Sequence, residues 1–287
     1  MNRPTLSFEF FPPKTGAGEA VFWQTLTQLA RYRPDFISVT YGAGGGNRAD
    51  TARLVCQAQN RFNLTAMAHL TCIGDTRANL DALLRHYQDN GIRHILALRG
   101  DRTPQMSADI LNQGDFTSSV PLVAYIHHYY PHFRVGVACY PEIHPEARDR
   151  GADIAFFVKK VHAGAQFAIT QFFYDNAALF RFVEEAYRIG GRIPIIPGIL
   201  PITDFRQVQR FAAIAGAALP SWLVESLERV RDDRLAMMEI GVEVAVRQCR
   251  ELLAWGVPGL HFFALNRSEA VSRVLDEIGT GMGMGSA

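Results

Sequence analysis

The segment Ser7-Phe8-Glu9-Phe10-Phe11-Pro12-Pro13 is a short run of strand-forming residues that carries one carboxylate and ends in two prolines. Alternate side chains of an extended strand point to opposite faces, so Glu9 shares a face with Ser7 and points away from its phenylalanine neighbours. A lone glutamate among phenylalanines is costly to bury unless it has a partner or a chemical task. The segment therefore predicts a first strand with Glu9 as a candidate functional residue.

Seven further strand-like runs follow, and helical patterns alternate with them along the chain. The predicted strands span 36–42, 65–72, 94–101, 135–141, 167–173, 194–200 and 259–265. The predicted helices span 21–32, 49–61, 76–90, 153–163, 177–189, 204–215, about 220–231, about 242–255 and 268–278, with one more that begins near Ser119.

Apolar strands that alternate with helices are typical of a parallel sheet covered on both faces. Eight such units favour a single α/β domain, a (β/α)8 TIM barrel over residues 1–278, with extra helices between strands seven and eight. The alternative is a doubly wound open sheet, which normally has a glycine-rich phosphate-binding turn after its first strand. Pro12 and Pro13 occupy that position here and lack backbone N–H groups. Residues 279–287 are expected to form a disordered tail.

The composition is that of a soluble globular protein, with 48% hydrophobic and 20% charged residues among 287. A net charge of +1 and a pI near 7.8 give no field that would attract nucleic acid or acidic lipid. No apolar run approaches the roughly 18–20 residues of a membrane helix, and the N-terminus does not resemble a signal peptide. The cysteines have no metal-ligand spacing and are expected to be reduced thiols. We therefore expect a cytoplasmic protein without nucleic-acid or membrane partners.

Polar side chains fall at the carboxyl-terminal end of every predicted strand except the seventh. This is the end of a barrel at which active sites lie. The residues are Glu9, Thr40, Tyr41, His69, Thr71, Arg99, Asp101, Tyr140, Glu142, His144, Gln171, Asn266 and Arg267.

Several of these residues also allow structural roles. His69 could be a hydrogen-bonded core histidine and Asp101 could cap a turn, whereas Asn266 and Glu269 have the spacing of a capping box. A purely structural role is harder to assign to Glu9. The helix-facing side of a barrel strand is apolar, so the carboxylate should point into the barrel mouth.

The candidate residues exclude several kinds of chemistry. They contain no His-x-His pair or carboxylate cluster for a metal, no Gly-x-Ser-x-Gly elbow and no strand-end lysine for a Schiff base. Two acids, a glutamine, two arginines and several aromatics instead suit an extended aromatic ligand and one proton-transfer step. The set predicts a cofactor-dependent enzyme without a metal.

Motifs on all eight strands, from about residue 6 to residue 275, can be compared with known families. They are Ser7-Phe8-Glu9-Phe10-Phe11-Pro12-Pro13-Lys14, Val39-Thr40-Tyr41-Gly42-Ala43, His69-Leu70-Thr71-Cys72, Leu98-Arg99-Gly100-Asp101, Tyr140-Pro141-Glu142-Ile143-His144-Pro145-Glu146, Ile169-Thr170-Gln171-Phe172-Phe173, Pro197-Gly198-Ile199-Leu200-Pro201 and Leu265-Asn266-Arg267. In this order they resemble the bacterial methylenetetrahydrofolate reductases, in the short form without a regulatory domain.

The resemblance implies a flavoprotein oxidoreductase that uses FAD to reduce 5,10-methylenetetrahydrofolate to 5-methyltetrahydrofolate. NADH or NADPH would supply the electrons in a ping-pong scheme, with hydride passing through N5 of the flavin. The reaction would belong to one-carbon metabolism and methionine biosynthesis. A homo-oligomer is also expected.

The resemblance also implies roles for individual residues. Glu9 would be the general acid that protonates the folate nitrogen, which requires a pKa above the usual value of about 4.3. A wall formed by Phe11 and the flavin is expected to raise this pKa, and Ser7 could orient the carboxyl group. Asp101 is a second catalytic candidate, and the substrates would be bound by Asp101, Gln171, Phe211 and Arg267. FAD would be held by Thr40, Tyr41, Ala43, His69, Arg99, Gly100, Asp101, Thr117, Ser118, Tyr140, His144, Ala147, Asp153 and Lys160.

The chain departs from the family pattern at two places. The segment between Asp101 and Tyr140 is longer than usual, and Phe263 stands where tyrosine is common. Another flavin barrel, such as a proline-dehydrogenase-like enzyme, and a non-enzymatic barrel that binds folate or flavin are the competing interpretations. Glu9 and Gln171 argue against the first of these, and Glu9, Asp101 and Gln171 together argue against the second.

Overall fold

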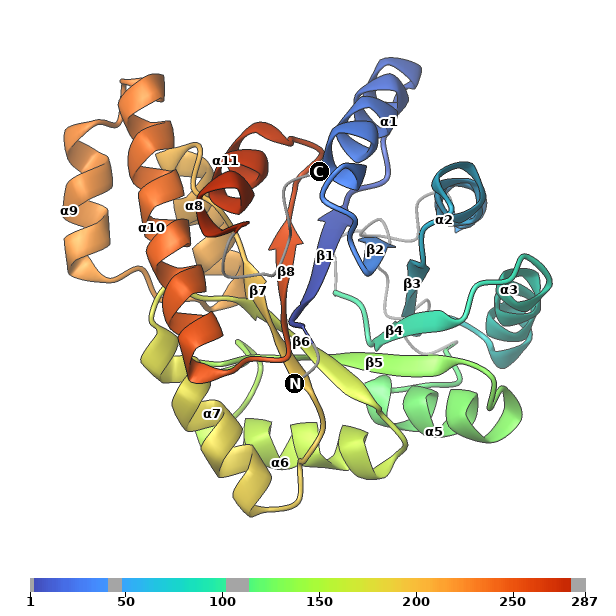
Figure 1. Ribbon diagram of the computed structural model, residues 1–287. Coiled ribbons are helices and arrows are strands. Elements are labelled where there is room, and N and C mark those ends of the chain that lie inside the picture. The colour runs from blue at the N-terminus through green and yellow to red at the C-terminus, as the bar shows by residue number, and fades with distance from the viewer. Residues whose placement is uncertain (1–2, 41–47, 102–113, 280–287) are drawn as a thin grey trace.

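Residues 3–40, 48–101 and 114–279 are described by the computed structural model (Figure 1). Eight parallel strands form a closed barrel in sequence order, and the last strand pairs with the first. Helices surround the barrel on the outside (Figure 1). The predicted (β/α)8 barrel is thus confirmed, and the open-sheet alternative is wrong.

The strands are short and separated by helices of nine to twenty-two residues. The strands are β1 (Thr5–Phe10), β2 (Phe36–Val39), β3 (Ala66–Thr71), β4 (His94–Leu98), β5 (Arg134–Cys139), β6 (Phe167–Phe172), β7 (Ile195–Ile199) and β8 (Gly259–Phe263). The helices of the described ranges are α1 (Gly16–Ala30), α2 (Arg48–Phe62), α3 (Arg77–Asp89), α5 (Ser119–Tyr129), α6 (Arg150–His162), α7 (Asn176–Arg188), α8 (Phe205–Ala215), α9 (Ser221–Arg229), α10 (Arg234–Trp255) and α11 (Glu269–Ile278). As predicted, additional helices lie between β7 and β8.

Two helices begin earlier than their apolar periodicity predicts. Helix α1 begins at Gly16, where the Thr15 side chain accepts a hydrogen bond from the backbone N–H of Gly18. Helix α10 begins at Arg234, because the Asp233 side chain caps the first turn. In both cases a capping side chain satisfies N–H groups that have no partner within the helix.

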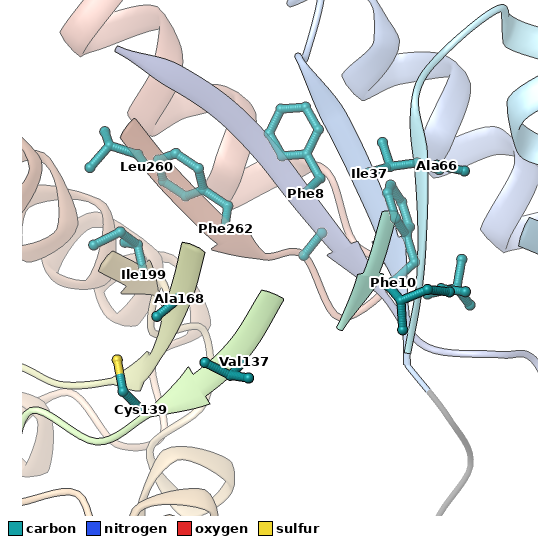
Figure 2. Close-up of a cluster of buried hydrophobic side chains, with 14 of the residues drawn as sticks. Phe8, Phe10, Ile37, Ala66, Val137, Cys139, Ala168, Ile199, Leu260 and Phe262 are labelled. Atoms are coloured by element: carbon teal, nitrogen blue, oxygen red, sulfur yellow. The ribbon is translucent and has the colours of Figure 1, made fainter. Parts of the chain in front are cut away.

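The apolar face of β1 packs outward against the helices. Phe8 and Phe10 are fully buried there, and the Phe10 ring meets Phe22 of α1 edge-on at 5.3 Å. Figure 2 shows these side chains beside Ile37 of β2 and Phe262 of β8. Burial of each such side chain contributes about 1.5–3 kcal/mol, so this layer holds the barrel and its helices together.

A smaller apolar cluster fills the inside of the barrel. It contains Met67, Phe167 and Ile169 among its buried members. Space for the Phe167 ring is provided by Gly136, since a Cβ atom at this position would lie 2.4 Å from the ring. The barrel is therefore a packed core below its mouth.

The loop after β8 is joined to the end of β1 by Asn266. Its side chain accepts a hydrogen bond from the Phe11 N–H at 3.0 Å and donates one to the Phe11 carbonyl at 2.9 Å. The predicted capping box of Asn266 and Glu269 is therefore wrong, because the Asn266 side chain is engaged with another strand and Ser268 is the N-cap residue of α11.

Among the described residues, no helix has the length and apolarity needed to cross a bilayer. All four cysteines, Cys56, Cys72, Cys139 and Cys249, are free thiols in the buried interior. Within the predicted tail, residues 280–287 lie outside the described residues.

Candidate active site at the barrel mouth

A cavity of about 1020 Å³ lies at the carboxyl-terminal ends of the strands. Its walls include Glu9 from β1, Gln171 from β6 and Phe263 from β8. Ligand sites in proteins commonly measure about 300–1,000 Å³, so this cavity can accommodate a large ligand.

The cavity brings together most of the residues that the sequence singled out. Its lining contains Glu9, Thr40, His69, Arg99, Gly100, Asp101, Thr117, Ser118, Tyr140, His144, Ala147, Asp153, Lys160, Gln171 and Phe211. Arg267 is not among the lining residues and is exposed on the loop after β8. Tyr41 and Ala43 lie outside the described residues. The individual roles of all these residues remain predictions.

Glu9 lies between two histidines and is only 9% exposed. Its Oε2 atom is 3.3 Å from His261 Nε2 and 3.4 Å from His69 Nε2. The Ser38 hydroxyl donates to the same oxygen at 3.5 Å. Glu9 therefore has partners from β2, β3 and β8.

These partners change the expected acidity of Glu9. Burial by itself raises the pKa of the carboxyl group, but the charge of His69 and hydrogen bonds from both histidines outweigh burial and lower the pKa to about 2. The expectation of a raised pKa is therefore wrong for this structure. An aromatic wall alone would raise this pKa, but the histidines that stabilise the carboxylate come from strands distant in sequence.

Ser7 acts on His261 rather than directly on Glu9. Its Oγ atom is 2.8 Å from His261 Nδ1 and also donates to the Leu260 carbonyl at 3.3 Å. The imidazole is fully buried, with the ring of Phe36 stacked 5.9 Å away and the ring of Phe263 edge-on at 5.5 Å. The expectation that Ser7 orients Glu9 is thus corrected, because His261 lies between them.

His261 and Ser38 were missed as site residues in the sequence. The strand register places Ser7 opposite His261 and Glu9 opposite Ser38. Alternation along β8 would have indicated that His261 and Phe263 share the inward face. Only the pairing between strands shows which inward residues stand at the same level.

A second group of charged side chains lines another part of the cavity. The Arg99 guanidinium donates to both oxygens of Glu146, at 2.5 and 2.7 Å, and these hydrogen bonds raise the pKa of Arg99. Lys160 is buried and donates to the Ala138 carbonyl at 2.8 Å, while burial lowers the pKa of its ammonium group. The Asp153 carboxylate accepts from the backbone N–H of His144 at 2.9 Å.

The backbone also approaches the cavity closely at two places. Gly100 has φ of 90°, and a Cβ atom there would lie 2.8 Å from Ile73, so only glycine fits this turn. Thr117, Ser118 and Ser119, at the start of α5, line the cavity, and the N-cap residue Ser118 makes no side-chain capping bond. Backbone N–H groups at such a helix end favour an anionic ligand.

Gln171 and Phe211 line the cavity from β6 and α8. The pairing of β6 with β7 shifts register between Ile169 and Phe172, which places Gln171 at an irregular point of the strand. Its side-chain oxygen accepts from the Phe172 N–H at 3.0 Å. Phe211 is half-buried and Ile214 beside it is 70% exposed, so α8 supplies an apolar wall.

A closed (β/α)8 barrel whose mouth cavity combines a buried carboxylate with cationic side chains has the architecture of a barrel enzyme. Residues 1–279 match the sequence family described as Methylenetetrahydrofolate reductase. The chain therefore belongs to the methylenetetrahydrofolate reductase family, a family of oxidoreductases of folate one-carbon metabolism, as the strand-end motifs indicated.

Individual relatives agree with this assignment. The chain is 37% identical over 279 residues to 5,10-methylenetetrahydrofolate reductase of Escherichia coli K12, covering 97% of this chain and 92% of that protein. It is 38% identical to the Salmonella typhimurium protein of the same name, with the same coverage. It is 34% identical to methylenetetrahydrofolate reductase (NADH) 1 of Arabidopsis thaliana, covering 95% of this chain and 48% of that protein.

A solved structure shares the fold at low sequence identity. An uncharacterized protein from Clostridium thermocellum, described as binding two copies of 5-methyl-5,6,7,8-tetrahydrofolic acid, superposes with a TM-score of 0.69 at 13% identity. The match covers 98% of this chain and 96% of that one. It supports the barrel fold.

Proposed function

We propose that this chain is an FAD-dependent enzyme that reduces 5,10-methylenetetrahydrofolate to 5-methyltetrahydrofolate with NADH or NADPH. The observation that carries the proposal is the placement of Glu9, which lines the same cavity as Gln171 and Phe211. When bound, FAD would accept hydride from the nicotinamide and pass it to the methylene carbon of the folate, one substrate replacing the other.

The donor set of the cavity fits FAD. Arg99 and Lys160 supply cationic groups, and the open first turn of α5 supplies backbone donors for phosphate. Gly100 leaves space for close approach of a ligand to the backbone. These residues, with Thr40, His69, Tyr140, His144 and Asp153, would hold the cofactor.

Glu9 would donate a proton to the folate nitrogen that leaves when the five-membered ring opens. Burial alone would raise the pKa of Glu9, but in this structure the charge of His69 and hydrogen bonds from both histidines lower it. A folate packed over Glu9 would exclude water from the carboxyl group and so favour its neutral, proton-donating form.

Other residues of the cavity would bind and orient the substrates. The exposed Asp101 carboxylate would stabilise the cationic ring-opened folate by its charge. The Gln171 amide would hydrogen-bond to nicotinamide and pterin in turn, and the Phe211 ring would stack on either one. Arg267, outside the cavity lining, would contact the part of the folate that extends beyond the mouth.

The test is a stopped-flow comparison of both half-reactions in wild type and Glu9→Gln. The variant keeps the shape of the side chain but lacks the acidic proton, so we expect normal flavin reduction and a loss of folate reduction of about 100-fold or more. Using NADH and NADPH in parallel identifies the preferred donor.

Glu225→Gln, the same substitution at an exposed position on α9, serves as the control and should leave both half-reactions unchanged. Near-normal folate turnover by Glu9→Gln would refute the acid role. A colourless protein that cannot be reconstituted with FAD would refute the cofactor assignment.

A further inference from the structure

Glu142 is a strand-end residue to which the proposed function gives no role. It follows β5, is half-buried and does not line the cavity. Its Oε2 atom accepts a hydrogen bond at 2.8 Å from the backbone N–H of Ala218, which is 76 positions away in sequence. Ala218 follows shortly after Ala215, the last residue of α8. The Glu142 carboxylate therefore connects the segment after β5 with the segment after α8.

The same two segments also pack directly against each other. Gly216 ends α8 in a left-handed conformation, with φ of 70°. A Cβ atom at this position would lie 3.0 Å from the Pro145 side chain and 3.2 Å from the Ile143 carbonyl oxygen. The chain after α8 thus rests on the segment that carries Glu142, and the hydrogen bond reinforces a contact between backbones.

Each of the two joined segments contributes to a different part of the proposed site. The segment after β5 lines the cavity with Tyr140 and His144, which we assign to FAD. Helix α8 lines it with Phe211, which we assign to the substrates. The side chain of Glu142 therefore links the part of the wall proposed for the cofactor to the part proposed for the substrates.

The segment after β5 has other contacts that hold it in place. The Arg150 guanidinium donates to the carbonyl oxygens of Pro141 and Glu142 at 3.0 and 2.8 Å. The Asp153 carboxylate accepts from the backbone N–H of His144 at 2.9 Å. Arg150 and Asp153 both belong to α6. This segment therefore stays attached to α6 whether or not the Glu142 side chain binds the chain after α8.

Helix α8 has fewer polar contacts of this kind. Its buried residues, Val208 and Ala212 among them, pack with residues of α9 and α10 in one apolar cluster. These three helices lie on the same side of the barrel (Figure 1). Among the described residues, the bond to Glu142 is the one hydrogen bond that joins residues 203–219 to another part of the chain. Loss of the carboxylate would release the C-terminal end of α8 and leave the segment after β5 in place.

We propose that Glu142 is a positioning residue that anchors the C-terminal end of α8 to the segment after β5 and thereby holds Phe211 in place over the cavity. The proposal rests on the proposed function, in which the Phe211 ring stacks on nicotinamide and pterin. Phe211 lies about one turn before the end of α8, so it follows any movement of that end. The contact needs an acceptor oxygen and no charge, so glutamine can replace Glu142 and alanine cannot.

Hydrogen–deuterium exchange of the FAD-containing protein, followed by NMR, measures the contact itself. We expect the Ala218 N–H to be protected in wild type and in Glu142→Gln, and to exchange about three- to tenfold faster in Glu142→Ala, as the loss of one hydrogen bond predicts. Glu228→Ala is the matched control, because it removes an exposed carboxylate that binds Arg231 on α9 and should leave Ala218 unchanged. An unprotected Ala218 N–H in wild type would overturn the proposal.

Kinetics and FAD binding separate positioning from a general structural defect. In Glu142→Ala we expect KM for both methylenetetrahydrofolate and NADH to rise about three- to tenfold, with kcat within about twofold of wild type, and we expect Glu142→Gln to restore both KM values. The dissociation constant of FAD, measured by flavin fluorescence, should not change, because the contacts with α6 remain. Unchanged KM values or weaker FAD binding in Glu142→Ala would overturn the proposal.

The two proposals can fail separately. If wild type neither binds FAD nor reduces folate, the proposed function fails. Faster exchange of the Ala218 N–H in Glu142→Ala than in wild type would still show that Glu142 anchors α8.

Discussion

Burial and charge act on Glu9 in opposite directions. The protein removes most of the water around the carboxyl group and replaces it with two imidazoles and a hydroxyl group. A lowering of the pKa from 4.5 to about 2 corresponds to roughly 3 kcal/mol of preference for the ionised form in the folded chain. The same residue that we assign to catalysis therefore also contributes to stability.

This contribution should depend on pH. The pKa of Glu9 is lower in the folded than in the unfolded chain, so its stabilisation is present above about pH 4.5 and is lost as the pH falls toward 2. We expect wild type to exceed Glu9→Gln in unfolding free energy by more at pH 7 than at pH 3, measured by urea denaturation. A difference that is independent of pH would contradict this.

For single residues, the direction of a side chain was predictable from the sequence, whereas its contacts were not. The inward direction of Glu9 followed from alternation along one strand, because its neighbours Phe8 and Phe10 had to face the helices. Its contact with His261 could not be predicted in this way, because that contact depends on the pairing of β8 with β1. The predicted direction of the Glu9 pKa shift was wrong for the same reason, because the histidines that lower this pKa were not foreseen.

Among the secondary-structure elements, α10 comes close to the backbone of the loop after β7 at Gly241. A Cβ atom at this position would lie 1.8 Å from the carbonyl oxygen of Ile202. This loop continues from Leu200, which lines the cavity. The absence of a side chain on α10 therefore lets the extra helices pack beside the barrel mouth.

Gly241→Ala should destabilise the chain. The favourable effect of alanine on an isolated helix is about 1 kcal/mol, whereas overpacking against backbone typically costs about 1–3 kcal/mol or more. We expect a net loss, measured as a lower thermal unfolding midpoint. Gly16→Ala on α1 is the control, because nothing lies within 4 Å of its added Cβ and its midpoint should not fall.

Asn266→Ala should also destabilise the chain, through the loss of two hydrogen bonds to the backbone of Phe11. Both bonds are exposed to solvent, so each contributes about the net value of a protein hydrogen bond, roughly 0.5–1.5 kcal/mol. Chemical denaturation should show this loss, while Asn60→Ala at an exposed position of α2 should leave stability nearly unchanged. Equal stability of the two variants would show that the Asn266 contacts are not needed.

The order and type of the elements were largely predictable from sequence. Apolar runs marked all strands to within a few residues, because parallel strands buried on both faces have no polar alternation. The starts of α1 and α10 were not marked, since glycines interrupt the apolar periodicity at Gly16 and Gly18 of α1 and at Gly241 of α10. Caps rather than periodicity determine those boundaries.

At the scale of the whole molecule, the cavity joins residues from across the barrel into one site. The carboxylate Glu9 and the cationic side chains Arg99 and Lys160 line the same space. The sequence predicted this convergence because parallel strands all end at the same rim. It could not predict which neighbours each group contacts within the rim.

FAD should stabilise the chain by binding to the folded state. A free concentration 100-fold above the dissociation constant contributes about 2.7 kcal/mol, which corresponds to a rise in the unfolding midpoint of roughly 5 °C. Differential scanning fluorimetry of stripped protein can measure this. Riboflavin, which lacks phosphates, should give a smaller rise, and an equal rise would contradict binding of phosphate by Arg99, Lys160 and α5.

The pairing of β1 with β8 has a consequence for synthesis of the chain. Glu9 and His261 are 252 residues apart in sequence. At roughly 5–20 residues per second, β1 leaves the ribosome on the order of 10–50 s before β8 can cover its second edge. An inward-pointing charge is one of the features that keep an open strand edge from pairing with another chain. We therefore expect Glu9→Leu to give more aggregated nascent chains in cell-free synthesis than wild type. The charge of Glu9 would then keep β1 from pairing with other chains before β8 has been synthesised.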